Sequence, residues 1–214
     1  NLIKAVEFIH RSGVIHRDIK PANLMVSPDF GVRLIDFGLS RTVNSNSSYD
    51  GEPVPKSKDE KKDLAQRLLA CRKDRKKRKR GLSPHVQTRI YRAPEVALLE
   101  NEYSFPADIW SVGCIIAEIL QCQSRYQLDI DEPYARYIFK STSCYPLSPC
   151  PDLQGNKEVT DRLEEHDLLK VMLKVLGDQK SYDLSFLTST SSMNFVHKNF
   201  SQEPRVKFEQ EFEG

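Results

Sequence analysis

The chain has 214 residues, of which 39% are hydrophobic and 29% are charged, and its formal net charge is +2. This balance is typical of a globular protein and excludes a wholly disordered chain. No apolar run reaches the roughly 18 residues that a membrane span needs, and the first residues read as a helix rather than as a signal peptide. We therefore expect no membrane partner.

The cysteines and histidines give no sign of a disulfide framework or a metal site. The five cysteines contain no C-x-x-C pair, and the five histidines have no zinc-ligand spacing. Without a secretory signal, reduced thiols are the expectation, which favours a cytoplasmic and/or nuclear protein.

The first elements are predicted to be a helix followed by a hairpin. Residues 1–12 place apolar side chains at three- and four-residue steps, and Gly13 ends this pattern. Residues 14–15, 24–26 and 32–35 are strand-like, and the turn residues between the last two predict a β-hairpin.

Residues 41–85 differ in composition from the rest of the chain. Within them, residues 56–80 hold 13 Lys and Arg against 4 Asp and Glu, a local charge of +9, so the remainder carries −7. Like charges at this density repel one another, which predicts an exposed and mostly disordered insert. A transient helical turn is expected only around Leu64 and Leu68.

The second half of the chain is predicted to be helical with an irregular interruption. Residues 107–122 are apolar on nearly all sides, which is typical of a helix in the middle of a core. Residues 123–158 are proline-rich and irregular, and residues 161–176 form an amphipathic pattern that ends at Gly177. The predicted fold is therefore mainly α with a short β-hairpin.

Two short motifs carry the chemistry. The first is His16-Arg17-Asp18-Ile19-Lys20-Pro21-Ala22-Asn23, and the second is Asp36-Phe37-Gly38. Together they present two carboxylates, an amide and an ammonium group. Phosphoryl transfer needs this set, because one carboxylate orients the attacking hydroxyl, a carboxylate and an amide hold Mg²⁺, and a lysine neutralises the moving phosphoryl group.

These motifs resemble the catalytic and metal-binding loops of eukaryotic protein kinases, including the 18-residue separation of Asp18 and Asp36. Residues 88–95, which read T-R-I-Y-R-A-P-E, resemble the end of the activation segment in the cyclin-dependent and MAP kinase group. Residues 108–114 resemble the buried helix that follows it. The resemblance implies a partial kinase domain over residues 1–214, a C-terminal lobe of α+β type, with the small lobe absent.

The resemblance also implies the roles of individual residues. Asp18 would be the catalytic base, Lys20 the partner of the ATP γ-phosphate, and Thr88 their brace. Asn23 and Asp36 would be Mg²⁺ ligands, and Met25 would pack beneath the adenine, although core packing is an equally ordinary role for it. His16 and Phe37 would be internal packing residues, and Asp108 would accept backbone hydrogen bonds from the catalytic loop.

Three further residues would be regulatory or would set specificity. Arg17 would contact a phosphorylated activation segment, Ser83 is a candidate acceptor of that phosphate, and Arg89 would favour proline beyond the substrate acceptor. The alternative for Ser83-Pro84 is a simple turn. Glu95 follows Asp36 by 59 positions, about 30 more than is usual, and an insert that long is either functional or disordered. The family normally pairs Glu95 with an arginine from later helices.

We therefore expect a proline-directed serine/threonine kinase that uses ATP and Mg²⁺, acts on proteins with Ser/Thr-Pro sites and has an upstream kinase as a further candidate partner. The fragment by itself is expected to be inactive. The alternative is a catalytically inactive kinase-like module that binds proteins. The basic run at residues 72–80 has three interpretations: a solvated insert, a nuclear import signal or a nucleic-acid contact. The last is the least favoured, because no aromatic residues are interleaved with the charges.

Overall fold

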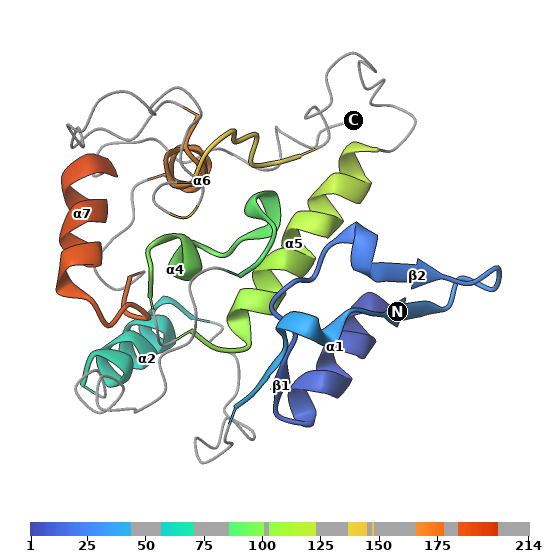
Figure 1. Cartoon of the computed structure of the whole chain (residues 1–214). Coiled ribbons are helices and arrows are strands. Elements are labelled where there is room, and N and C mark those ends of the chain that lie inside the picture. Colours follow the sequence, from blue (N-terminus) through green and yellow to red (C-terminus); the bar gives the residue numbers. More distant parts are fainter. Residues whose placement is uncertain are drawn as a thin grey trace.

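The computed structural model describes residues 1–43, 57–70, 86–100, 103–122, 137–144, 147, 166–177 and 184–200. Figure 1 shows the long helix α5 (Pro106–Gln121) crossing the middle of the molecule. Helix α1 (Leu2–Arg11) and the hairpin lie on one side of it. The short helix α4 (Pro94–Ala97) and helices α6 (Leu168–Leu176) and α7 (Thr190–Phe200) lie on the other. The prediction of a mainly helical fold with short antiparallel strands is confirmed for the described residues.

The N-terminal elements form as the sequence predicts. Helix α1 buries Val6 and Ile9, and the chain turns at Gly13, which has a φ of +71°. Strands β2 (Leu24–Val26) and β3 (Val32–Leu34) pair antiparallel as the predicted hairpin. Strand β1 (Val14–Ile15) also forms, but its partner is β4 (Arg41–Thr42). Residues 41–42 therefore belong to the folded body and not to the predicted insert.

Helix α2 (Lys58–Ala70) is a second departure from the prediction. Only a transient turn was expected here, yet the helix has 13 residues. Its first turn is closed by a reciprocal capping box, in which the Glu60 amide donates to Ser57 Oγ at 3.1 Å and the Ser57 amide donates to Glu60 Oε2 at 3.3 Å. Ala65 is buried, so the helix also has a packed side. The basic run at residues 72–80 lies outside the described residues.

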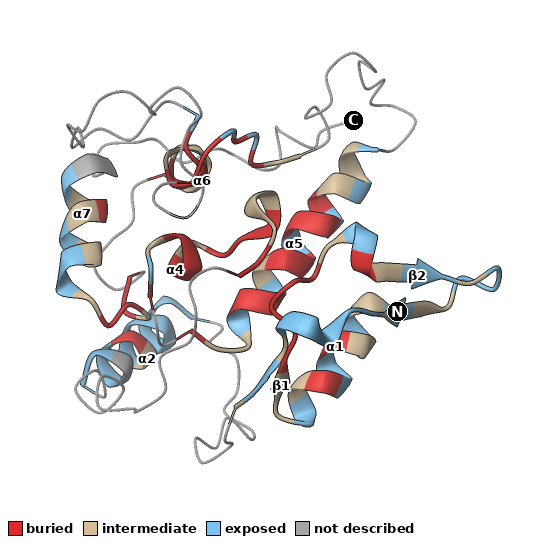
Figure 2. Cartoon of the chain, in the orientation of Figure 1, coloured by how far each residue is buried: buried red, intermediate tan, exposed pale blue. Residues whose placement is uncertain are grey.

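The main core forms where α5 meets α1, the loop after β1 and helix α6 (Leu168–Leu176). Figure 2 shows the buried residues concentrated on α5, on α4 and on the chain between β1 and β2. Side chains far apart in sequence, such as Val6, Ile115 and Met172, share this core cluster. It ties the loop that contains Asp18 to the most central helix.

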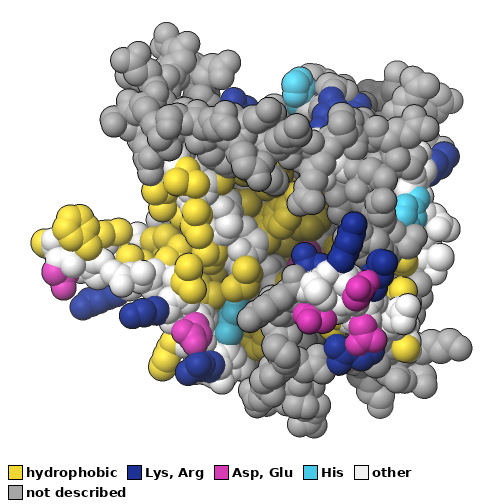
Figure 3. Space-filling model, turned by 180° about the vertical axis from the view of Figure 1, so that it is seen from behind, with side chains coloured by type: hydrophobic (Ala, Val, Ile, Leu, Met, Phe, Trp, Pro, Cys, Tyr) yellow, Lys and Arg dark blue, Asp and Glu magenta, His cyan; other side chains and the backbone are white. Residues whose placement is uncertain are grey.

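Helix α5 is not buried on nearly all sides, contrary to the prediction. Its inner side is buried, but Ile109, Ile116 and Ile119 are 53%, 43% and 59% exposed. These positions follow the helical period and so share one face of the helix. Figure 3, a view of the molecule from behind, shows hydrophobic side chains gathered from the middle of the molecule towards its left side.

The last described elements are helices α6 and α7 (Thr190–Phe200). Helix α6 begins at Leu168, because Asp167 is its N-cap and accepts a hydrogen bond from the Leu169 amide at 3.0 Å. Helix α7 is joined to the centre through Glu100, whose carboxylate accepts from the Thr188 amide at 2.6 Å. Among the described helices, none is both long and apolar enough to cross a bilayer.

Candidate active site

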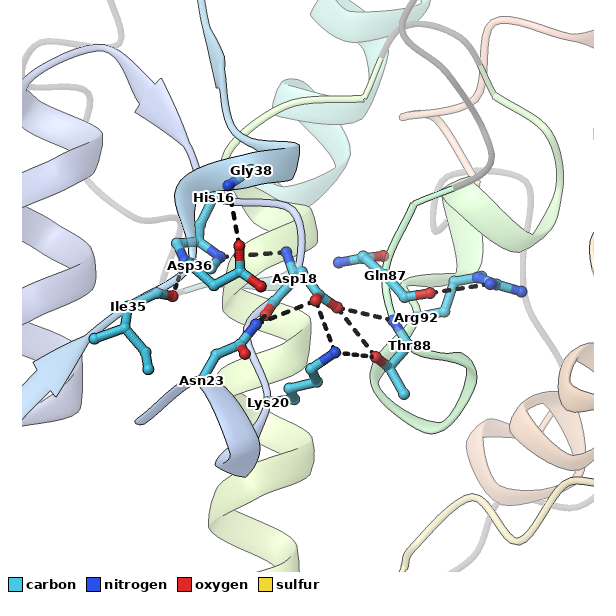
Figure 4. Close-up of polar contacts among 10 residues, drawn as sticks. All are labelled: His16, Asp18, Lys20, Asn23, Ile35, Asp36, Gly38, Gln87, Thr88 and Arg92. Carbon is cyan, nitrogen blue, oxygen red and sulfur yellow. Dashed lines mark hydrogen bonds and ion pairs between the residues drawn. The ribbon is translucent and has the colours of Figure 1, made fainter. Parts of the chain in front are cut away.

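Three predicted residues, Lys20, Asn23 and Thr88, converge on the carboxylate of Asp18 (Figure 4). Lys20 Nζ lies 2.8 Å from one carboxylate oxygen, and Asn23 Nδ2 donates to the same oxygen at 3.1 Å. The Thr88 hydroxyl and amide donate to the other oxygen at 3.1 and 3.2 Å. Lys20 Nζ also donates to Thr88 Oγ1 at 3.1 Å. The loop after β1 and the distant segment 86–92 thus meet at a single carboxylate.

The environment of Asp18 keeps this carboxylate ionised. Burial acts to raise its pKa, but the hydrogen bond and the charge of Lys20, with hydrogen bonds from Thr88 and Asn23, outweigh burial. The net result is a pKa below the ordinary value of 3.8. At neutral pH the group is therefore a negatively charged hydrogen-bond acceptor.

Asp108 on α5 holds the loop that contains Asp18 through hydrogen bonds to the loop backbone. Asp108 is fully buried, and its two oxygens accept from the backbone amides of His16 and Arg17, both at 2.8 Å. His10 Nε2 lies 2.8 Å from the same carboxylate. The predicted contact between Asp108 and this loop is present, and His10 is an additional partner that the sequence reasoning did not identify.

His16 links this loop to the Asp36-Phe37-Gly38 motif. Its ring is fully buried, its Nδ1 accepts from the Asp18 amide at 3.3 Å, and its Nε2 lies 3.0 Å from the Ile35 carbonyl oxygen. These partners assign the proton to Nε2. The Phe37 ring packs edge-on against the imidazole, with 4.9 Å between the two ring centroids, although Phe37 is 44% exposed.

Asn23 and Asp36 have the donor sets that a magnesium site requires. The Asn23 amide nitrogen is used in bonds to the carbonyl and carboxylate of Asp18, which leaves its side-chain oxygen for a ligand. Asp36 has a left-handed φ of 63°, and its exposed carboxylate accepts a hydrogen bond from the Gly38 amide at 3.2 Å. Figure 4 shows Asn23 and Asp36 on one side of Asp18 and Thr88 on the other. One carboxylate and one amide fit Mg²⁺ bound together with nucleotide phosphates.

Met25 lies outside this cluster. It is on β2 and is 57% exposed, so its side chain contributes to the open surface of the hairpin rather than to the core. Core packing, the ordinary alternative for this residue, is therefore excluded.

Arg17 is almost fully buried. Its guanidinium donates from Nε to the Leu39 carbonyl at 2.6 Å and from Nη1 to the Tyr103 hydroxyl at 2.9 Å. Its backbone has a φ of 68°, a conformation that non-glycine residues adopt at a cost. Arg17 therefore has two hydrogen-bond acceptors within the fold, the Leu39 carbonyl and the Tyr103 hydroxyl. Ser83 lies outside the described residues.

The segment that carries Thr88 is held by Gln87 and Arg92, two residues that the sequence reasoning missed. The Gln87 amide donates to the Ala107 carbonyl at 2.9 Å and to Ser111 Oγ at 3.1 Å, and its oxygen accepts from the Ala93 amide. Arg92 donates to the carbonyls of Val86 and Gln87 at 3.2 and 3.0 Å. The second arginine of T-R-I-Y-R was the available signal for Arg92.

An open cleft of about 310 Å³ adjoins these residues. It is lined by Asp18, Lys20, Leu39, Val86, Gln87, Thr88 and Arg92. Arg89 does not line it, and Arg89 Nε is buried without a hydrogen-bond partner in the described part of the chain. The structure therefore places Arg92, rather than Arg89, at the wall of the cleft beside Asp18.

Comparison with known proteins agrees with this geometry. A family model of the protein kinase domain matches residues 1–182. Mitogen-activated protein kinase 2 of Arabidopsis thaliana is 24% identical over 213 residues, 100% of this chain and 39% of that protein. Mitogen-activated protein kinase p38b of Drosophila melanogaster is 28% identical over 213 residues, which are 100% of this chain and 39% of that protein. Mitogen-activated protein kinase 15 of Xenopus laevis is 38% identical over 119 residues, 56% of this chain and 16% of that protein.

The chain therefore spans less than two-fifths of the length of these relatives. Because the kinase model covers most of the chain, and because Lys20, Asn23 and Thr88 surround the Asp18 carboxylate, the chain belongs to the protein kinase family and is MAP kinase-like.

Proposed function

We propose that the full-length protein is a proline-directed serine/threonine kinase that transfers the γ-phosphoryl group of ATP to protein hydroxyls. The observation that carries the proposal is the convergence of Lys20, Asn23 and Thr88 on an ionised Asp18. Substrate proteins with Ser/Thr-Pro sites and an upstream kinase are its proposed partners.

The residues of the chain have complementary tasks in this reaction. Asp18 accepts a hydrogen bond from the attacking hydroxyl, orients it towards the γ-phosphorus atom and takes its proton as the new O–P bond forms and the bond from that phosphorus to the leaving ADP breaks. Lys20 neutralises the oxygens of the moving phosphoryl group. Thr88 contacts both groups and so fixes their separation, which makes the arrangement ready before substrate binds.

Mg²⁺ bound by Asn23 and Asp36 would screen the charge on the ATP phosphates. The second bond of Asn23 to Asp18 keeps the amide turned so that its oxygen, and not its nitrogen, is available. The Asp36 carboxylate is exposed and is oriented by its hydrogen bond from the Gly38 amide. Met25, exposed on β2, is proposed to contact the adenine.

Lys20 supports serine/threonine specificity, because the resemblance associates a lysine at this position with that class of kinase. The way that Arg92 is bonded supports the proposed preference for proline. The Gln87 backbone has a φ of 64°, and its carbonyl accepts from Arg92 rather than facing the cleft. The Val86 carbonyl is also bonded to Arg92. A substrate amide beside the acceptor residue then finds no partner here, whereas proline has no N–H to leave unpaired.

The test is a kinetic comparison in the full-length protein. Asp18→Asn removes the base and should lower kcat by about 10²-fold or more. Asp29→Asn, at the exposed tip of the hairpin, removes the same charge far from the site and serves as the control. Full activity of Asp18→Asn would refute the assignment, and an inactive wild-type protein would instead favour a protein-binding module.

Substrate preference is tested with two peptides that differ only in Ser-Pro against Ser-Ala. The wild-type protein should prefer the Ser-Pro peptide. Arg92→Ala should reduce this preference, because the carbonyls of Val86 and Gln87 lose their internal donor. An equal rate on both peptides in the wild-type protein would reject proline direction while leaving kinase activity intact.

A further inference from the structure

We propose that Tyr103 is a positioning residue whose hydroxyl holds Arg17, and with it the catalytic loop, in the absence of an activating phosphate. The proposal rests on the kinase function proposed above. It concerns a residue that belongs to neither motif and lies 85 positions after Asp18 in the sequence.

Arg17 needs partners because of its burial. A guanidinium remains charged at all accessible pH values, and only 3% of this residue is exposed. Its two hydrogen bonds go to the Leu39 carbonyl and to the Tyr103 hydroxyl, which are both neutral acceptors. Among the ion pairs of the described residues, none includes Arg17. The two neutral acceptors therefore satisfy buried N–H donors of Arg17 that a carboxylate or phosphate would otherwise satisfy.

Tyr103 is itself held rigidly. It is 6% exposed and shares a buried cluster with Val86, Val96 and Ala107, which come from the Thr88 segment, α4 and the start of α5. A bond from this cluster to Arg17 connects the catalytic loop to the end of the activation segment. The bond from Arg17 to the Leu39 carbonyl also connects the segment that follows the Asp36 motif. One guanidinium thus joins the three segments that must be aligned for catalysis.

The Tyr103 hydroxyl stays neutral in this position. Burial raises its pKa, although the hydrogen bond and charge of Arg17 and the charge of Arg41 act in the opposite direction. A neutral acceptor satisfies the geometry of Arg17 without cancelling its charge. The site therefore keeps its attraction for an anion, so a phosphate on the activation segment would strengthen an arrangement that already exists.

The test is Tyr103→Phe in the full-length protein after phosphatase treatment. Removing the hydroxyl leaves Arg17 Nη1 buried without that acceptor and should displace the loop, which lowers kcat by about 10-fold or more. KM for ATP should change much less, because Tyr103 is not among the residues that are proposed to bind ATP or Mg²⁺. Tyr103→His, which restores an acceptor near the ring edge, should recover part of kcat.

Tyr91→Phe is the matched control, because it also removes one buried hydroxyl, the one that donates to Glu118 Oε2 at 2.6 Å. Amide hydrogen exchange of residues 14–20 in the full-length protein gives a readout that does not depend on activity. Exchange should rise in Tyr103→Phe and not in Tyr91→Phe. Unchanged exchange and kcat in Tyr103→Phe would overturn the proposal. If the wild-type protein has no kinase activity, the proposed function fails, and the exchange comparison still decides the role of Tyr103.

Discussion

Asp108→Asn should destabilise the protein and disable the site, although it preserves the shape of the side chain. Asp108 is fully buried and accepts from the His16 and Arg17 amides and from His10. An asparagine has one oxygen, so whichever way it turns, its NH₂ group faces at least one of the two backbone N–H donors. Losing a bond to a charged acceptor and burying a donor against a donor costs about 3 kcal/mol.

This cost is large against a typical stability of about 5–15 kcal/mol. With an m-value of about 2 kcal/mol per molar urea, the unfolding midpoint should fall by about 1.5 M. In the full-length protein kcat should fall by about 10²-fold, because Arg17 keeps its left-handed backbone only while both amides are held, and a displacement of about 1 Å at Asp18 is enough for that loss. Asp29→Asn is the control. If Asp108→Asn had an unfolding midpoint within about 0.3 M urea of the wild-type value and a normal kcat, the reasoning would be refuted.

Glu95→Gln should stabilise the chain at pH 7 and have no effect near pH 4. Burial raises the pKa of Glu95 above 4.5, so ionising it in the folded state is costly above that value and the cost disappears below it; thermal unfolding of both proteins against pH measures this, and equal stabilities at pH 7 would contradict it. Glu100→Ala should cost about 3 kcal/mol and raise hydrogen exchange throughout α7, because Thr188 and Ser189 lose their acceptor; unchanged exchange in α7 would show that this contact does not hold the helix. Replacing Lys76, Lys77, Arg78 and Lys79 with alanine should abolish nuclear accumulation if the basic run is an import signal, and imaging that shows unchanged nuclear localisation would reject that role.

The difference between α2 and the prediction shows the limit of charge patterning. The density of Lys and Arg argued against stable structure in residues 41–85. Yet Ser57 and Glu60 cap the first turn, and the burial of Ala65 adds packing that a charge count cannot anticipate. Strand β4 was missed for a related reason, because a two-residue strand is defined by its partner, Val14–Ile15, and not by its own sequence.

Helix α5 shows the opposite case. Its apolar composition predicted burial on nearly every side, but burial depends on which elements surround the helix, and Ile116 and Ile119 remain exposed. The sequence pattern identified the helix and its position to within one or two residues. It contained no information about which of its faces is covered.

The sequence by itself determined the family of this chain. Asp18, Lys20, Asn23 and Asp36 lie within 19 residues of one another, so their motifs and spacing were sufficient to predict a phosphoryl-transfer site. Tertiary structure alone decided what supports that site. His10, Tyr103, Gln87 and Arg92 act through hydrogen bonds between residues that are in most cases tens of positions apart, whereas the contact of Asp108 with the loop was already expected from the resemblance. Such bonds depend on how the helices pack around α5, and no local pattern in the chain encodes that packing.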